Sequence, residues 1–179
     1  MNALKYCIAA TAALATGLAV ADRIDIVSER QAAKFWQPDP NATQYVAGYP
    51  ETARDKKRDV CVSIGFLIKN DGTTSNYTQM SAWGNSADGS IRQADAQPYV
   101  QVAAAVVSRW KFVPVIKPHS IYTSATFAFD GSKALGEEAI RAQCRIDDLP
   151  TFVAQAKTRS DDRGDMNRRR ADAVRMGQY

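Results

Sequence analysis

The sequence has little of the chemistry that catalysis requires. Its 179 residues include one histidine and three cysteines, and no metal-ligand spacing or nucleophile motif occurs among them. The histidine, His119, stands between Pro118 and Ser120, and a loop histidine without a paired Cys, Asp or second His is usually solvated. Ser81 and Ser124 have no base that the sequence positions beside them. We therefore expect no enzyme activity, no cofactor, no metal and no small-molecule substrate.

Membrane-spanning and nucleic-acid-binding features are also lacking. The apolar run of residues 8–21 is short for a bilayer, which needs about 20 residues. The net charge of +4 is mild. Its basic cluster, Arg168–Arg170, lies in a tail charged in both signs, and no basic strip is interleaved with aromatic residues. We expect no nucleic-acid partner and a protein that is peripheral to a membrane at most.

The beginning of the chain carries an export signal. Lys5 precedes the apolar run, which closes on the small-x-small pattern Ala19-Val20-Ala21, typical of a signal peptide. We expect cleavage after Ala21 and a mature protein in the periplasm; the alternative is an uncleaved inner-membrane anchor. Cys7 precedes the apolar run, which argues against a lipoprotein. The mature chain keeps Cys61 and Cys144 in an oxidising compartment.

The stretch from Gln97 to Pro114 predicts a helix that turns into a strand. Its apolar residues recur at the 3, 4, 7 spacing of one helical face; they are Val102, Ala103, Val106, Val107 and Trp110. Pro98 suits the first turn of a helix. Pro114 forbids continuation, so Trp110 and Phe112 lie at the corner between this helix and the next element.

Alternating patterns predict three strands. Val60–Ile68 is the clearest and the most apolar, and the residues Asn70-Asp71-Gly72 after it favour a tight hairpin turn. The partner strand is expected from Thr73 to about Ala82. A further strand, Ile121–Phe129, ends at the turn signal Asp130-Gly131. Because Val60–Ile68 is the most apolar, we expect it at the centre of the sheet.

The 45% apolar content suits one globular domain with appendages. We expect a signal peptide (1–21), a segment with a helix around Ser28–Trp36 (22–48), the domain itself (49–131), a helical extension (132–157) and a charged tail (158–179). Tyr49-Pro50 opens a short helix through about Lys57. In the extension, Ala134–Arg145 and Leu149–Ala156 are expected to be helical.

Motifs along residues 49–131 resemble those of the TonB C-terminal domain family, an energy transducer. They are Tyr49-Pro50 with Ala53, Asp71-Gly72, Ser81-Ala82, Ala105-Val106-Val107 and Arg109-Trp110-Lys111-Phe112-x-Pro114. The resemblance implies an α+β fold, a three-stranded antiparallel sheet with two helices on one face, to which this chain adds its helical extension. We expect the motif residues Tyr49, Pro50, Asp71, Gly72, Trp110, Phe112 and Pro114 to be mainly structural.

The same resemblance implies a protein-interaction domain with a role in energy-dependent transmembrane transport. The family captures the N-terminal box of an outer-membrane transporter by adding it as a strand to a sheet edge, and another envelope protein with an extended segment would fit as well. No proline or charge guards the expected edge. Its residues are Ile121, Tyr122, Thr123, Ser124, Ala125, Thr126 and Phe127.

Departures from the family keep other hypotheses open. The sequence shows neither the uncleaved anchor nor the long proline-rich spacer of an energy transducer, since its seven prolines are scattered. The alternative is an accessory or structural envelope domain whose sheet edge is covered by its own C-terminal extension and which has no role in energy transduction. An envelope enzyme would need a reactive group that the sequence does not reveal.

The two cysteines of the mature chain are expected to form a disulfide, since Cys61 lies on the face of its strand opposite Val62 and Phe66. Cys61 points to the sheet face that the family's helices leave open, and Cys144 lies in the extension that is placed to cover this face. We expect a bond between them; the alternative is two unpaired thiols.

Overall fold

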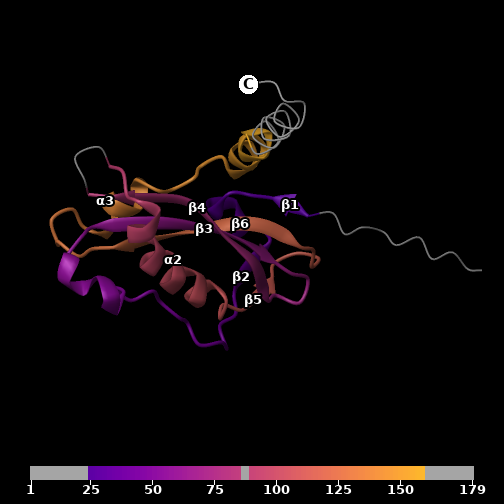
Figure 1. The fold of residues 1–179 in the computed structure, drawn as a ribbon. Helices are drawn as coiled ribbons and strands as arrows, with labels where there is room; N and C mark the ends of the chain where they lie inside the picture. The colour runs from indigo at the N-terminus through magenta and orange to yellow at the C-terminus, as the bar shows by residue number, and fades with distance from the viewer. Residues whose placement is uncertain (1–23, 86–88, 160–179) are drawn as a thin grey trace, which may run out of the picture.

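A computed structural model describes residues 24–85 and 89–159, and its centre is a four-stranded sheet in the order β1-β6-β3-β4 (Figure 1). The central strand β3 (Val60–Ile68) pairs antiparallel with both β4 (Thr74–Gly84) and β6 (Ile121–Phe129), as predicted. The predicted three-stranded sheet is corrected by β1 (Asp25–Ile26), which joins β6 in the parallel direction. The expected signal peptide and nearly all of the charged tail lie outside the described residues.

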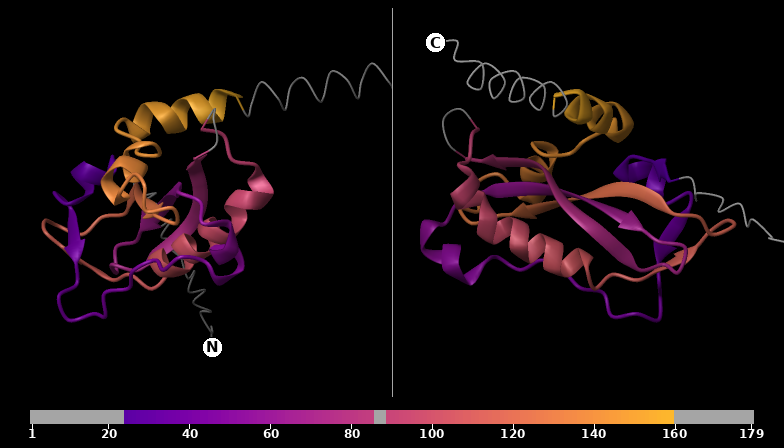
Figure 2. Two further views of the ribbon diagram at one scale, coloured as in Figure 1. Left: turned by 90° about the vertical axis from the view of Figure 1, so that its left-hand side faces the viewer. Right: turned by 45° about the vertical axis from the view of Figure 1, so that its right-hand side comes forward.

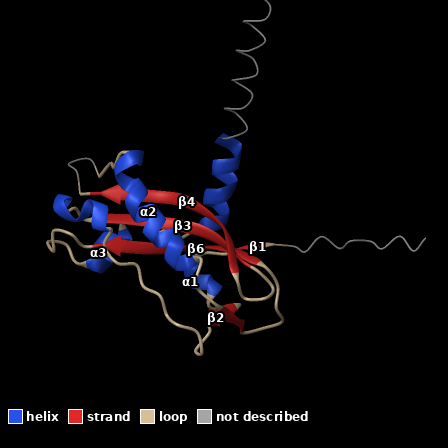
Figure 3. Cartoon of the chain, turned by 60° about the horizontal axis from the view of Figure 1, so that its bottom comes forward, coloured by secondary structure: helices blue, strands red, loops and turns tan. Residues whose placement is uncertain are grey.

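One face of the sheet holds the main core. Helix α2 (Gln93–Val107) lies across this face (Figure 3), and the 3-10 helix η1 (Glu51–Lys56) contributes Ala53 to the same core. The two predicted helices on one face are therefore present. Helix α2 begins one turn earlier than predicted because the N–H groups of Asp95 and Ala96 bond back to Arg92 O. Pro98 consequently lies inside the helix.

The opposite face is covered by the C-terminal extension. Helix α3 (Glu137–Ala142) packs there, and Cys144 just beyond it forms the predicted disulfide with Cys61 of β3. The helix is shorter than predicted, since it begins after Gly136. A second helix of the extension occupies residues 149–159 and lies on the opposite side of the sheet from α2 (Figure 2).

A second, two-stranded sheet joins β2 (Trp36–Pro38) to β5 (Phe112–Pro114). Trp36 is 3% exposed and its indole N–H donates to His119 O at 3.1 Å, which fixes the N-terminal segment to the domain. The predicted helix of this segment is only one turn long, α1 (Glu29–Ala32), with the expected capping box at Ser28. No helix in the described parts of the chain is long and apolar enough to cross a membrane.

Candidate functional site

The predicted edge strand, β6, is partly covered by the protein itself. Over Ile121 and Tyr122 it pairs with β1. The N–H of Val27 continues this pairing by donating to Tyr122 O at 2.9 Å. The expectation of a bare edge is thus wrong for this half of the strand, because the N-terminal segment supplies a neighbouring strand. The role of β6 in binding a partner stays a prediction.

On the side away from β3, the other half of β6 has no strand of the described residues beside it, and side chains bind its backbone instead. The N–H of Thr126 donates to Glu29 Oε1 at 3.2 Å, and its hydroxyl donates to Glu29 Oε2 at 2.9 Å. On the same residue, Arg141 Nη1 donates to the carbonyl oxygen of Thr126. One carboxylate and one guanidinium therefore satisfy both backbone groups of Thr126.

A pocket of about 490 Å³ opens at this half of the strand. It is lined by Glu29, Tyr45, Val46, Ala47, Trp110, Ala125, Thr126, Phe127, Ala128, Glu137 and Arg141. We call Tyr45, Val46, Ala47 and Trp110 the apolar wall of this pocket. It is open to a partner at Val46, which is 85% exposed. The volume lies within the range of about 300 to 1,000 Å³ usual for binding pockets.

Trp110 joins two other residues that line the pocket, Tyr45 and Phe127. The indole N–H donates to Tyr45 O at 3.0 Å, and the ring stacks on Phe127 with the centroids 5.7 Å apart. The guanidinium of Arg109 lies over the Tyr45 ring, 5.3 Å from its centroid, a cation–π arrangement. Trp110 is thus both a core residue and a wall of the pocket.

The structure brings only part of the predicted edge to this pocket. Ala125, Thr126 and Phe127 line it, whereas Ile121 and Tyr122 pair with β1. Thr123 and Ser124 are each 2% exposed and do not line the pocket. The docking edge predicted from the sequence is therefore shorter in this structure than expected.

The motif residues Tyr49 and Pro50 make contacts that hold the start of the domain in place. The hydroxyl of Tyr49 contacts the backbone of Arg58 and the hydroxyl of Tyr99, and Pro50 precedes η1 as its N-cap. Burial, together with the bond to Tyr49, raises the pKa of Tyr99 well above its usual range. These contacts join the start of the domain to α2.

The remaining motif residues join the hairpin to β5. Asp71 accepts the N–H and the hydroxyl of Thr73 at 2.9 and 2.6 Å, and these bonds lower the pKa of its carboxyl. Gly72 O accepts the N–H of Phe112 at 3.0 Å. Pro114 ends β5 opposite Trp36.

The sequence interpretation missed Glu29, Arg141 and β1. The only signal for β1 is the alternation Ile24-Asp25-Ile26, which is too short to distinguish a strand from a loop. Glu29 and Arg141 stand in helices, where an acidic residue in the first turn and a basic residue in the last turn have an ordinary role. Nothing in their spacing connects them to Thr126.

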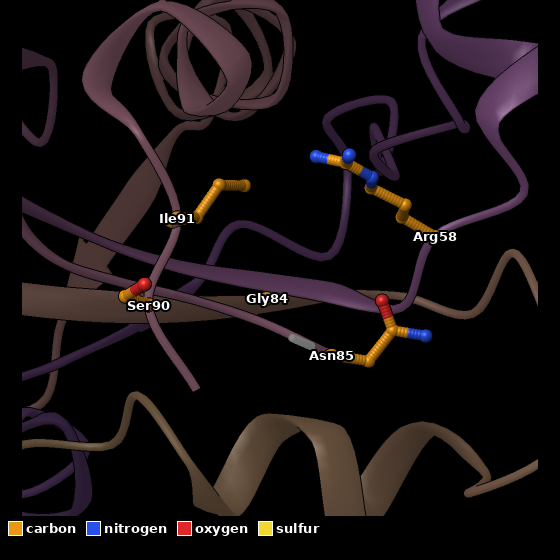
Figure 4. A pocket seen from close by; sticks show the side chains of 5 residues that line it. All are labelled: Arg58, Gly84, Asn85, Ser90 and Ile91. Carbon is orange, nitrogen blue, oxygen red and sulfur yellow. The ribbon is translucent and has the colours of Figure 1, made fainter. Parts of the chain in front are cut away.

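Further cavities occur in the described part of the chain. One, of about 150 Å³, is lined by Arg58, Gly84, Asn85, Ser90 and Ile91 (Figure 4). It is small for a ligand. Near it, Lys56 and Arg92 both donate hydrogen bonds to the carboxylate of Asp95, and these bonds lower the pKa of that carboxyl to about 2. Another, of about 510 Å³, is an apolar groove between the sheet and the helix at 149–159, where Lys157 is the one charged lining residue. It borders the half of β6 that pairs with β1, because Ile24, Ile26 and Tyr122 line it.

Metal ligands do not converge in the described part of the chain, where no group of three or more His, Cys, Asp or Glu residues is placed to hold a metal ion. His119 is less solvated than expected. Its ring lies edge-on to Phe35 with the centroids 5.3 Å apart, and Nε2 is 3.4 Å from Asp25 Oδ2. The contact joins the loop before β6 to β1.

The fold and this site define an α+β domain whose central sheet has a partly covered edge beside a mixed polar and apolar pocket. No family model matches the sequence, and no curated protein matches it. Among solved structures, the chain is similar to the solution NMR structure of the TonB C-terminal domain from Pseudomonas aeruginosa, with 16% identity and a TM-score of 0.39. The similarity covers 57% of this chain and 91% of that one.

Proposed function

We propose that this protein is an exported interaction domain that binds an extended segment of another envelope protein at the outer edge of β6. The observation that carries the proposal is the state of Thr126. Its backbone N–H and C=O are bonded by the side chains of Glu29 and Arg141, at a pocket with an open apolar wall. Backbone groups at a sheet edge are the groups that strand addition uses.

The pocket suits a peptide better than a compact ligand. An added strand offers alternating side chains, and the lining offers both apolar residues, Val46 and Trp110 among them, and the charged Glu29, Glu137 and Arg141. Apolar and polar side chains of one strand would therefore both find suitable neighbours in it. The motif resemblance suggests the N-terminal box of an outer-membrane transporter as the segment.

The periplasm is the proposed location. The signal pattern at residues 1–21 supports it, and so does the disulfide between Cys61 and Cys144, because such bonds persist in oxidising compartments. Participation in energy-dependent transport is part of the same proposal.

The second candidate is an accessory envelope domain whose edge is kept closed by its own chain. The contacts of β1, Glu29 and Arg141 with β6 favour it. Most of this cover comes from the N-terminal segment, whereas the sequence had suggested the C-terminal extension. In this reading the protein takes no part in energy transduction.

A peptide titration followed by NMR tests the proposal. The probe is a synthetic peptide copying the N-terminal box of an outer-membrane transporter, added to the exported chain. We expect the largest shifts at Ala125–Ala128, and a dissociation constant about tenfold weaker for Val46→Lys, which places a charge on the apolar wall. Ile116→Lys is the matched control, since Ile116 is an exposed apolar residue (50%) outside the pocket. Shifts that do not saturate, or an equal loss in both variants, would count against the proposal.

A further inference from the structure

Residues 25–29 follow the outer edge of β6, and we call them the cover segment. Asp25 and Val27 donate their backbone N–H groups to this edge, and Glu29 continues the line with its carboxylate on Thr126. The segment runs parallel to β6. Up to Val27 it therefore occupies the place and direction of an added parallel strand, and at Glu29, the first residue of helix α1, only the side chain reaches the edge.

At Thr126 the cover segment and α3 reproduce the hydrogen bonds of a strand. A neighbouring strand gives a carbonyl oxygen to the N–H of its partner and an N–H to the carbonyl. Here a carboxylate oxygen of Glu29 takes the first place, and a guanidinium N–H of Arg141 takes the second. Because Thr126 is 2% exposed, it would have two unpaired buried backbone groups if both side chains left.

The cover segment is held less firmly than the rest of the sheet. Strand β1 has two residues, whereas β3 and β6 pair over nine. Ile24 and Ile26 are 50% and 36% exposed. Val27 and Ser28 are buried, at 8% and 6%, and of the two Val27 belongs to the main core cluster. Few buried contacts mark the parts of a fold that open most readily.

The cover segment nevertheless stays close to the edge when it leaves. Trp36, seven residues beyond Glu29, is 3% exposed and begins β2, which tethers the segment to the domain. A short tether gives an effective concentration in the millimolar range. A partner must therefore compete with a segment that is always present.

We propose that the cover segment is an internal substitute for the partner strand, which the partner displaces. This inference rests on the proposed function. The segment also shows which partner fits: a peptide that is extended and parallel to β6 up to a β-branched apolar residue in the place of Val27, and that then turns as this chain does at the start of α1. Two positions later it carries a carboxylate, in the place of Glu29.

The chemistry of the two positions supports this choice of partner. Val27 packs in the main core cluster, and β-branched side chains suit a pleated, buried surface. At Thr126 an acceptor is required by the N–H, and the guanidinium of Arg141 on the same residue favours a negatively charged one. Glu137 also lines the pocket, so a second carboxylate in the partner would meet a like charge there.

The test uses a fluorescent peptide that copies residues 24–30 of this protein and the exported chain as receptor. In the variant Val27→Pro, Glu29→Ala, the internal segment loses its N–H donor to Tyr122 and its carboxylate. We expect this variant to bind the peptide at least about tenfold more tightly than the wild type. Arg30→Ala, an exposed neighbour, should behave as the wild type, and a peptide with Val27→Asp should not bind.

Hydrogen exchange at the Thr126 amide provides a second readout. Glu29→Ala alone should speed this exchange, and addition of the peptide should slow it again, which a purely structural role of Glu29 would not produce. If the double variant does not fold, Glu29→Ala decides by the same two measurements. Equal peptide binding by the wild type and a folded variant, whether tight or absent, would overturn the inference.

The two proposals fail in different ways. We call the double variant and Glu29→Ala the released variants. If the transporter peptide binds at the pocket but the peptide of residues 24–30 binds neither released variant, the proposed function stands and the proposal that the cover segment substitutes for the partner is wrong. If the peptide of residues 24–30 binds only the released variants while the transporter peptide binds neither form, the edge is usable and the transporter is the wrong partner.

Discussion

At the scale of single residues, Tyr49 illustrates how a motif residue serves the fold. Its hydroxyl donates to Arg58 O and accepts from Arg58 N–H, both at 3.0 Å. A phenol has one hydrogen to donate, so the 2.8 Å contact must be a bond that Tyr99 donates to Tyr49. One oxygen atom therefore joins the chain before β3 to α2.

Replacing Tyr49 by phenylalanine removes this oxygen and leaves three polar groups without it. We expect Tyr49→Phe to lower the free energy of unfolding by about 1–3 kcal/mol, measured by urea denaturation. Tyr45→Phe deletes the same atom at a residue that is 36% exposed and should change stability by less than about 0.5 kcal/mol. Equal midpoints for the two variants would contradict the assignment.

At the scale of elements, the β3–β4 hairpin is fixed to β5 through Gly72. This residue has φ of 75°, and a Cβ atom built on it would lie 2.0 Å from Phe112 O. The sequence predicted the turn from its tolerance of positive φ, but not the contact with β5. Glycine is required here for two reasons, its backbone conformation and the close approach of a second backbone.

We expect Gly72→Ala to destabilise the protein by about 1–3 kcal/mol, because the residue is strained at positive φ and its methyl group meets a backbone oxygen. Gly48→Ala is the control, since nothing lies within 4 Å of its Cβ position, and it should be close to neutral. Thermal unfolding of both variants measures the difference. A neutral Gly72→Ala would show that the turn is free of β5 in solution.

The elements that the sequence predicted well are those with long periodic patterns. Strands β3 and β6 alternate over nine residues each, and their pairing through a central β3 follows from the apolar character of that strand. Strand β1 has two residues, and α3 is six residues long. Patterns of that length do not distinguish a helix or strand from a loop.

The site was predictable only in part, for a related reason. The expectation of a central Val60–Ile68 strand put Thr126 in a strand beside it, where the structure also has it. Its partners Glu29 and Arg141 are 97 and 15 residues away in the chain, and side-chain bonds to an edge leave no periodic signal. Only the folded chain brings these residues together.

At the scale of the whole molecule, the disulfide ties the C-terminal extension to the sheet. Cys61 is 0% exposed and Cys144 2% exposed, and they are 83 residues apart in sequence. The bond also holds α3 where Arg141 reaches Thr126. The disulfide therefore fixes the extension to the sheet beside the residue, Arg141, that bonds the outer edge of β6.

Replacing both cysteines by alanine should lower the free energy of unfolding by roughly 2–4 kcal/mol, because the unfolded chain gains conformational freedom. Urea denaturation measures the change, and the reduced wild type should resemble the variant. Two alkylatable thiols in the unreduced, unfolded mature protein, which lacks Cys7, would contradict the bond.

The central claim is that the pocket beside β6 meets another envelope protein. Site-specific photo-crosslinking in intact cells tests it most directly, with a photoreactive side chain at Val46 and, as control, at Ile116, both exposed apolar positions. We predict a defined adduct with one envelope protein from position 46, weakened by an excess of the transporter peptide, and none from position 116. No adduct from position 46, or the same adducts from both positions, would contradict the claim.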